Sequence, residues 1–332
     1  MKIVNSHAYA RAALLGNPSD GYFGKTLSLV VKNFSATVVL YEWPELEIIL
    51  TRQDRCLFES MDELVEDVKL SGLYGGLRLI KAAIKRFAEY CHGSGIKLPA
   101  QNFSLRYQTT IPRQVGLAGS SAIITAVYRA LMQFYQVEIP LPVLPNLILE
   151  VETREIGIAA GLQDRVAQTY EGLVYMDFNR AYLEANGHGH YEPLDPGLLP
   201  PLYLAYRTDL SEISGIVHSN LRARWERGDM DVIMAMKTLG DLTDQGRECL
   251  LQRNYAGLKE LMDRNFDIRA KIVNLDPRNV EMVHLARRLG TCANYAGSGG
   301  SIIGICESPQ TFSKLQEEFA RWRCQVIRPR IV

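Results

Sequence analysis

Hydrophobic and polar residues along the first part of the chain follow the pattern of β-strands. Residues 28–43 (SLVVKNFSATVVLYEW) and 46–52 (LEIILTR) are rich in β-branched and aromatic side chains. Such runs favour strands when turn-forming residues bound them. A dense cluster of these, GNPSDGYFGK, occupies residues 16–25 and predicts a turn. The region 1–55 is therefore predicted to be rich in β-strand.

A strictly alternating segment and an amphipathic segment follow each other in the middle of the chain. Residues 102–112 (NFSLRYQTTIP) alternate between apolar and polar positions, which predicts a half-buried strand. Residues 121–136 repeat apolar side chains at helical spacing, with Ile123 and Val127 on one face. The pattern predicts a strand, a short connection and then a helix.

Helical periodicity recurs throughout the rest of the chain. The predicted helices cover 61–70, 75–91, 147–161, 214–228, 230–250, 257–275, 279–290 and 309–321. Short strands are predicted at 173–178, 200–206 and 324–332, and a strand–loop–strand unit at 292–306. A change in composition near residue 200 predicts a boundary between two domains.

Composition and charge narrow the class of protein. The chain of 332 residues is 47% hydrophobic and 22% charged, as is typical of globular proteins. Its 37 basic residues balance its 37 acidic residues, which argues against nucleic acid or an anionic membrane as a partner. Six scattered cysteines without a CxxC pair predict reduced thiols in a cytoplasmic protein. Neither a signal peptide nor an apolar run of about 20 residues is recognised.

The connection between the alternating strand and the helix, RQVGLAGSSAIITAV at 113–127, combines two glycines with two serines. The first N–H groups of a helix lack internal partners and attract anions such as phosphates. Gly116 and Gly119 are expected to take positive φ and to let the backbone approach a ligand. Ser120 or Ser121 is expected to cap the helix or to reach a metal bound to phosphates. The alternative is a plain helix N-cap after a glycine turn; no lysine follows, so this is not a Walker A motif.

Three motifs, in order along the chain, resemble the signatures of the GHMP kinase superfamily. The first is RAALLGNPSD at 11–20, similar to the GRxxLxGxxxD motif of sugar kinases. The second reads PxxxGLxxSSA, and its fixed positions are Pro112, Gly116, Leu117, Ser120, Ser121 and Ala122. Ala118 and Gly119, between them, are a mild departure from the family and are also expected to line the nucleotide loop. The third is AGSGGS at 296–301. Further segments at 14–29, 157–178 and 214–229 narrow the resemblance to the plant-type glucuronokinases, over about residues 5–305.

The resemblance implies a fold and a reaction. The fold is α/β plus α+β: a ribosomal-S5-like ATP-binding domain at 1–195 and a ferredoxin-like domain at 196–332. ATP and the sugar are expected to meet between the two. The implied reaction is phosphoryl transfer from ATP to the anomeric hydroxyl of a sugar acid, D-glucuronate. The alternatives are another GHMP sugar kinase of the heptose or galacturonate type, a non-catalytic sugar or nucleotide sensor, and a structural α/β protein without a phosphate site.

The resemblance also assigns roles to individual residues. Asp164 matches the aspartate that faces the acceptor hydroxyl, and Arg11 matches a basic residue beside it that keeps a carboxylate ionised. Asp20 matches a sugar-binding aspartate. The alternatives are an N-cap for Asp164, a surface ion pair for Arg11 and a simple turn residue for Asp20. From the third motif, the residues implied to lie near nucleotide and substrate are Gly297, Ser298 and Gly299.

A kinase of this type is expected to use Mg²⁺, which prefers oxygen ligands. Ser121 and Glu152 are the candidate ligands, and Glu152 precedes Asp164 by 12 residues, close to the spacing in the family. Glu150 and Glu155 are competitors, since Glu155 follows Glu152 by three residues and would share its side of an α-helix.

The carboxylate of a sugar acid calls for arginine, which binds carboxylates in a bidentate manner. Arg165, Arg222 and Arg224 are candidates, and the choice among them stays open. Arg222 and Arg224 are not expected to face one ligand, because positions i and i+2 of a helix point apart. His188 and His190 form an HxH pattern in a glycine-rich stretch, which is interpreted as a loop without metal.

Overall fold

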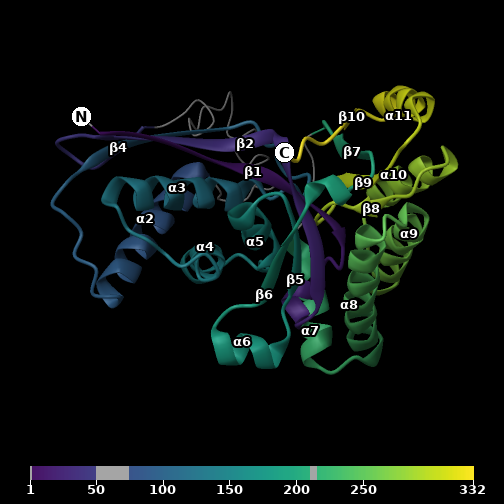
Figure 1. Ribbon diagram of the computed structural model, residues 1–332, viewed down its shortest axis with the longest axis horizontal. Helices are drawn as coiled ribbons and strands as arrows, with labels where there is room; N and C mark the ends of the chain where they lie inside the picture. Colours follow the sequence, from purple (N-terminus) through teal and green to yellow (C-terminus); the bar gives the residue numbers. More distant parts are fainter. Residues whose placement is uncertain (1, 50–74, 210–214) are drawn as a thin grey trace, which may run out of the picture.

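A computed structural model describes residues 2–49, 75–209 and 215–332, with the backbone alone at 215–220. The predicted helix at 61–70, Cys56 and the end of the predicted strand at 46–52 lie outside the described residues. Figure 1 shows two strand-containing regions joined side by side, with long strands at one end of the molecule and a bundle of helices at the other.

The first sheet has six strands in the order β3–β4–β2–β5–β6, with β1 paired to β2. They are β1 (Ile3–Leu15), β2 (Lys25–Glu42), β3 (Glu47–Ile49), β4 (Phe103–Thr109), β5 (Leu173–Asp177) and β6 (His190–Leu194). All pairs are antiparallel except β3 with β4. The long strand β2 carries β1 along one edge, while β4 and β5 share its other edge.

Four helices cover one face of this sheet (Figure 1). They are α2 (Gly76–Gly93), α3 (Gly119–Tyr135), α4 (Leu144–Glu150) and α5 (Gln163–Tyr170). Every residue of α3 from Ser121 to Tyr128 is buried, so the expectation of a helix with one apolar face is too narrow. The reason is its place in the fold, since α3 packs on β1 and β2 and is itself covered by α2, α4 and α5.

The second sheet is antiparallel throughout, in the order β10–β7–β9–β8. Its strands are β7 (Leu202–Arg207), β8 (Asn294–Tyr295), β9 (Ser301–Ile305) and β10 (Cys324–Ile327). The accompanying helices are α7 (Gly215–Glu226), α8 (Met230–Leu251), α9 (Tyr255–Ile272), α10 (Pro277–Arg288) and α11 (Pro309–Arg321). The bounds of α11 are those expected from the sequence, because Ser308 accepts a hydrogen bond from the N–H of Thr311 and so caps its start.

One hydrophobic cluster runs from the first sheet into the second. It includes Leu15 of β1, Leu258 and Met262 of α9 and Ile303 of β9. A backbone hydrogen bond of 2.8 Å from the Ala13 N–H to the Ala296 carbonyl joins β1 directly to the loop before β9. The two sheets therefore hold β1 and the 296–301 loop in a fixed relation. The domain boundary at 195/196 stays a prediction.

Two segments differ from the sequence-based expectation. The predicted helix at 147–161 is α4 followed by a π-helical turn, η3 (Val151–Ile156), and it ends at Gly157 with φ of 77°. The stretch around the HxH pattern contains helix α6 (Arg180–Asn186) and strand β6, which begins at His190 because His190 pairs with Asp177 of β5. In the described part of the chain, no helix combines the length and the apolar character needed to cross a bilayer.

Candidate active site

The glycine–serine loop enters helix α3 differently from the expectation. The helix begins at Gly119, and the residue before it, Ala118, has φ of 60°. Positive φ therefore occurs at Gly116 (70°) and Ala118, whereas Gly119 is helical. Neither serine caps the helix. Both lie in its first turn, where the Ser121 hydroxyl donates to the Ala118 carbonyl (3.2 Å) and the Ser120 hydroxyl donates to Oε1 of Glu152 (2.7 Å).

The carbonyl groups of this loop are tied back to the protein. Gly116 accepts from Nη1 of Arg11 (3.5 Å), and Leu117 accepts from the Arg11 N–H (3.2 Å). Ala118 accepts from Nε2 of Gln168 (2.8 Å). In a trans peptide the C=O and the next N–H point in opposite directions, so the following N–H groups are directed away from Arg11 and Gln168. N–H groups directed in this way at a helix start are suited to an anion, so the loop stays the candidate phosphate site.

Leu117 anchors the loop, since only 1% of its surface is exposed, while Pro112 is half-buried between β4 and the loop. The third motif packs against the same loop. A Cβ added to Gly297 would lie 1.9 Å from the Gly116 carbonyl oxygen, and one added to Gly116 would lie 2.8 Å from the Ser298 nitrogen. Each position therefore excludes any residue larger than glycine, and the second and third motifs are in direct backbone contact.

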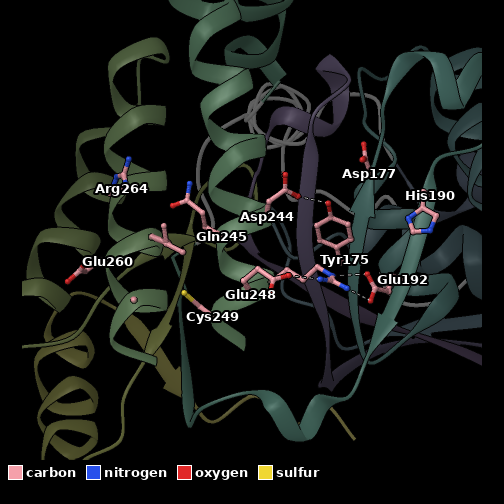
Figure 2. A pocket seen from close by; sticks show the side chains of 13 residues that line it. Tyr175, Asp177, His190, Glu192, Asp244, Gln245, Glu248, Cys249, Glu260 and Arg264 are labelled. Carbon is pink, nitrogen blue, oxygen red and sulfur yellow. Dashed lines mark hydrogen bonds and ion pairs between the residues drawn. The ribbon is translucent and has the colours of Figure 1, made fainter. Parts of the chain in front are cut away.

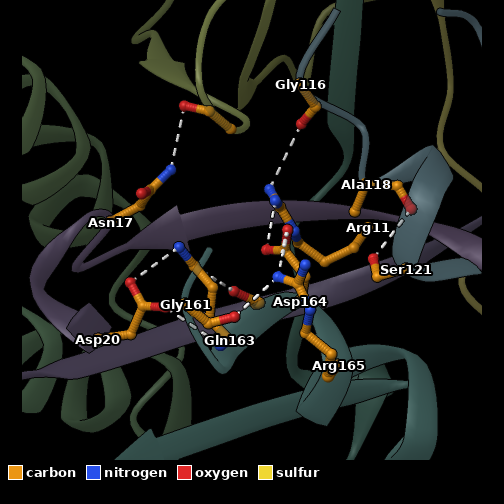
Figure 3. Close-up of polar contacts among 12 residues, drawn as sticks. Arg11, Asn17, Asp20, Gly116, Ala118, Ser121, Gly161, Gln163, Asp164 and Arg165 are labelled. Atoms are coloured by element: carbon orange, nitrogen blue, oxygen red, sulfur yellow. Dashed lines mark hydrogen bonds and ion pairs between the residues drawn. The ribbon is translucent and has the colours of Figure 1, made fainter. Parts of the chain in front are cut away.

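Arg11, which belongs to the first motif, contacts both the second and the third motif. Its side chain extends from β1 and is almost entirely buried. Nη1 donates to the Ala296 carbonyl as well as toward Gly116, and Nη2 forms an ion pair with Oδ1 of Asp164. Figure 3 shows Asp164 between Arg11 and Arg165, beside the start of α3. The surface ion pair considered for Arg11 is therefore wrong.

Asp164 lies in the first turn of α5 and does not cap it, because the N-cap residue is Leu162 without a side-chain bond. Nη1 of Arg165 approaches Oδ2 of Asp164 to 3.3 Å, opposite the contact with Arg11. The Asp164 side chain keeps 19% of its surface exposed, against 4% for each arginine. Two guanidinium groups thus fix an accessible carboxylate, which is the geometry required of a group that orients a hydroxyl.

Asp20 lies against the first residue of α5, the helix that carries Asp164. It lies in the short helix η1 (Ser19–Tyr22) and accepts hydrogen bonds from the N–H and from Nε2 of Gln163, both 3.2 Å. Its carboxylate leaves no room for a Cβ at Gly161, which would lie 2.1 Å from Oδ2. Burial, and secondly the charge of Asp164, raise the pKa of Asp20 to about 6. Asp20 is therefore bonded to α5 and is more than a local turn residue.

Arg269 of α9 is a member of this site that the sequence did not single out. It is 2% exposed and donates to the carbonyls of Gly297 (2.8 Å) and Ser298 (3.3 Å). Nδ2 of Asn17 donates to the same Gly297 carbonyl (3.1 Å). Burial lowers the pKa of Arg269 to about 10. The sequence does contain a sign of this role: Asn265 and Arg269 are polar residues on the apolar, buried side of the predicted helix at 257–275.

Of the three glutamates, only Glu152 faces the loop. It is 1% exposed, accepts from Ser120 and forms an ion pair with Arg165. Glu150 contacts Arg86 of α2 (2.9 Å to Nε), and Glu155 contacts Lys85 of α2 (2.6 Å).

The expectation that Glu155 shares a side with Glu152 is wrong. The π-helical turn closes i→i+5 hydrogen bonds, so residues three apart no longer align. The oxygen donors of Glu152 and of the adjacent serines suit Mg²⁺ chemically.

The arginines considered for a substrate carboxylate are differently placed. Arg165 is buried against Glu152 and Asp164. Arg224 donates to the Ile272 carbonyl (2.7 Å) and contacts Asp229 (3.3 Å). Arg222 points the other way, as expected for i and i+2, and donates to the Gly21 carbonyl (3.0 Å).

A pocket of about 740 Å³ lies elsewhere, between β5–β6 and α8–α9 (Figure 2). Its lining includes Tyr175, Asp244 and Arg247, and Tyr175 donates to Asp244 (2.5 Å). None of the predicted site residues lines it. His190 borders this pocket, and the residues that the structure describes contain no cluster of three or more His, Cys, Asp or Glu side chains suited to a metal.

Comparison with known proteins shows the family of this chain. The sequence profile of the GHMP kinases N terminal domain matches residues 78–172. Glucuronokinase 1 of Arabidopsis thaliana is 45% identical over 324 residues, which cover 95% of this chain and 88% of the relative. The chain belongs to the glucuronokinase family of GHMP kinases. Probable glucuronokinase 2 of the same plant is 44% identical, over 98% of this chain and 91% of the relative.

Solved structures confirm the predicted fold of this GHMP kinase. The galactokinase of Lactococcus lactis, solved with galactose, superimposes with a TM-score of 0.78 over 99% of this chain and 94% of the other. At 15% identity this likeness concerns the fold alone. The fold is therefore the GHMP-kinase fold expected from the three motifs, with both sheets included.

Proposed function

We propose that this GHMP kinase transfers the γ-phosphoryl group of ATP to the 1-hydroxyl of D-glucuronate and forms glucuronate 1-phosphate. The observation that carries the proposal is the Arg11–Asp164 ion pair, which joins the acceptor-side carboxylate to the Gly116 loop through a single side chain. The near full-length similarity to the Arabidopsis glucuronokinases supports the choice of substrate.

The residues divide the work of phosphoryl transfer, which needs positioning and charge stabilisation more than covalent chemistry. The N–H groups from Leu117 to Ser121 bind the phosphates of ATP. Asp164 accepts the hydrogen of the anomeric hydroxyl and aligns its oxygen with the γ-phosphorus. Arg11 keeps Asp164 ionised and stabilises the negative charge on the transferring group.

Other groups hold the sugar. Asp20 accepts hydrogen bonds from ring hydroxyls, and its bonds with Gln163 hold it beside the helix that carries Asp164. The loop Gly297–Gly299 closes the site beside Gly116, with Arg269 behind it.

Mg²⁺ bound with ATP is part of the proposal, and when bound it neutralises phosphate charge. Glu152 and Ser121 would hold it. Glu152 is already fixed by Arg165 and Ser120 at the start of α3, so its position does not depend on the ligand. We further propose an ATP-binding part at 1–195, a second part at 196–332 and a cytoplasmic enzyme whose partners are small molecules.

A coupled assay of ADP release with a panel of acceptors tests the substrate. We expect turnover with D-glucuronate. If glucuronate and galacturonate are both inert while a heptose phosphate is phosphorylated, the proposed substrate is wrong and a heptose kinase takes its place. Titration calorimetry with a non-hydrolysable ATP analogue and Mg²⁺ tests the kinase itself, because absence of binding up to millimolar concentration contradicts it.

A further inference from the structure

A uronic acid differs from a neutral sugar by its carboxylate, and the kinase needs a cation to select it. Three arginines of the site are already engaged by the protein. Arg11 and Arg165 are almost entirely buried in ion pairs with Asp164 and Glu152. Arg269 is 2% exposed, and both of its terminal nitrogens donate to backbone carbonyls. None of the three offers an open pair of N–H groups to a carboxylate.

Arg222 of α7 is differently placed, at the outer side of the turn that carries Asp20. Nη1 donates to the Gly21 carbonyl (3.0 Å), and the guanidinium lies over the Tyr22 ring, 5.3 Å from its centre. These two contacts hold the guanidinium against Gly21 and Tyr22, the two residues that follow Asp20 in the chain. Burial raises the pKa of Tyr22; the positive charge of Arg222 opposes this rise, and the negative charge of Asp20 adds to it. Both charges therefore lie within electrostatic reach of the Tyr22 ring.

The remaining edge of Arg222 is available to a ligand. The side chain is 53% exposed, and Nε has only the distant Glu226 at 3.7 Å as an acidic neighbour in the described structure. An exposed pair of this kind contributes little and is easily exchanged for another carboxylate. Arg224 lacks such an edge, because Asp229, Asp231 and the Ile272 carbonyl occupy its nitrogens.

We infer that Arg222 binds the carboxylate of the sugar acid through its Nε–Nη2 edge and thereby determines the preference for a uronic acid over a neutral sugar. The contacts with Gly21 and Tyr22 orient this edge before the ligand arrives. The inference rests on the proposed function, since it assigns a residue to the carboxylate of that substrate.

Steady-state kinetics of Arg222→Gln and Arg222→Lys test this assignment, with D-glucuronate and its neutral analogue D-glucuronamide as acceptors. Arg222→Gln is expected to raise KM for glucuronate about 30-fold, the scale of a lost charged hydrogen-bonded contact. The kcat value and KM for ATP are expected to change less than about twofold, because the reacting atoms are untouched. The preference for glucuronate over glucuronamide should fall toward one, and Arg222→Lys should restore part of it.

Arg180→Gln is the matched control. Arg180 is also exposed, also pairs with a glutamate four residues on, and also lies over an aromatic ring of the same turn, 5.4 Å from the centre of Phe23. Its removal lowers the local positive charge equally and is expected to leave both KM values unchanged. If Arg180→Gln and Arg222→Gln raise KM for glucuronate equally, the cause is the loss of local positive charge in general, and the assignment of Arg222 is overturned.

The remaining outcomes separate the two proposals. If the wild type phosphorylates glucuronate and Arg222→Gln leaves its KM unchanged, the assignment is wrong while the proposed function stands. A fall in kcat without a change in KM also contradicts it, since Arg222 would then act on structure or catalysis. If the wild type binds ATP and is inert with glucuronate, the proposed function fails first, and the assignment falls with it.

Discussion

Arg11 and Asp164, which are 153 positions apart in the chain, form an ion pair at the junction of β1, α5 and the Gly116 loop. The pair is possible because β1 is bonded both to the loop, through Leu117, and to the third motif, through Ala296. Each of the three motifs therefore contributes to the position of one carboxylate.

Asp164→Asn is expected to reduce turnover at least about a hundredfold, because the amide does not accept the hydroxyl proton as a carboxylate does. The change is nearly isosteric, so ATP binding measured by calorimetry should stay within a few-fold of wild type. Retention of normal turnover would contradict the assigned role of Asp164. The sensor interpretation would be favoured only if the wild type showed no turnover and Asp164→Asn left ligand binding unchanged.

Gly116→Ala is expected to lower the affinity for ATP and the melting temperature together. The residue has φ of 70°, and the added Cβ would lie 2.8 Å from the Ser298 nitrogen, which is backbone and cannot turn aside. Gly95→Ala is the matched control, with a similar φ of 68° and open space around the new methyl group. Both variants pay the cost of positive φ, about 1 kcal/mol. Equal losses in both would show that the contact with the third motif is unimportant.

Glu152→Gln is expected to destabilise the protein by about 3 kcal/mol, since it leaves Arg165 buried with a weakened partner. It should also raise the Mg²⁺ concentration needed for half-maximal activity. Glu155→Gln removes an exposed pair with Lys85 and should cost less than about 1 kcal/mol, without effect on Mg²⁺. Chemical denaturation and Mg²⁺ titration of activity measure the two effects. An equal Mg²⁺ requirement in both variants would exclude Glu152 as a ligand.

Asp20 gives stability a pH dependence of known sign. Its pKa is about 6 in the folded protein and 3.8 in the reference state, so the folded state holds this proton more tightly. Stability then falls as the pH rises from about 4 to 6, by at most about 3 kcal/mol, and is level above that range.

Asp20→Asn removes the cost of ionising a buried carboxyl group. The melting temperature of the variant should therefore exceed that of wild type at pH 7.5, and the difference should disappear near pH 4. Asp241→Asn, on the exposed face of α8, is the control and should follow the wild-type profile. A constant difference between Asp20→Asn and wild type across this range would refute the assigned pKa shift.

Much of the fold follows from local pattern. The strict alternation at 102–112 gave β4, and the apolar periodicity with Ser308 at its start gave α11 with its observed bounds. The three motifs are short and contiguous in the sequence, so they can be recognised in order along the chain. Arg11 and Asp20 belong to the first motif, and Asp164 was assigned through the family resemblance. The structure brings all three around α5.

Other features arise only when distant segments meet. The sequence favoured Glu152 by its spacing to Asp164 and left Glu150 and Glu155 as competitors. The π-helical turn directs Glu152 toward Ser120, while the other two contact α2. The participation of Arg269 likewise required α9 to pack behind the 296–301 loop. The spacing of apolar residues along one element predicts which of its sides is buried, because this pattern is contained in a single stretch of sequence. The partner that a buried charge meets depends on how the elements pack, and in this kinase that packing decides which charges remain available to the substrate.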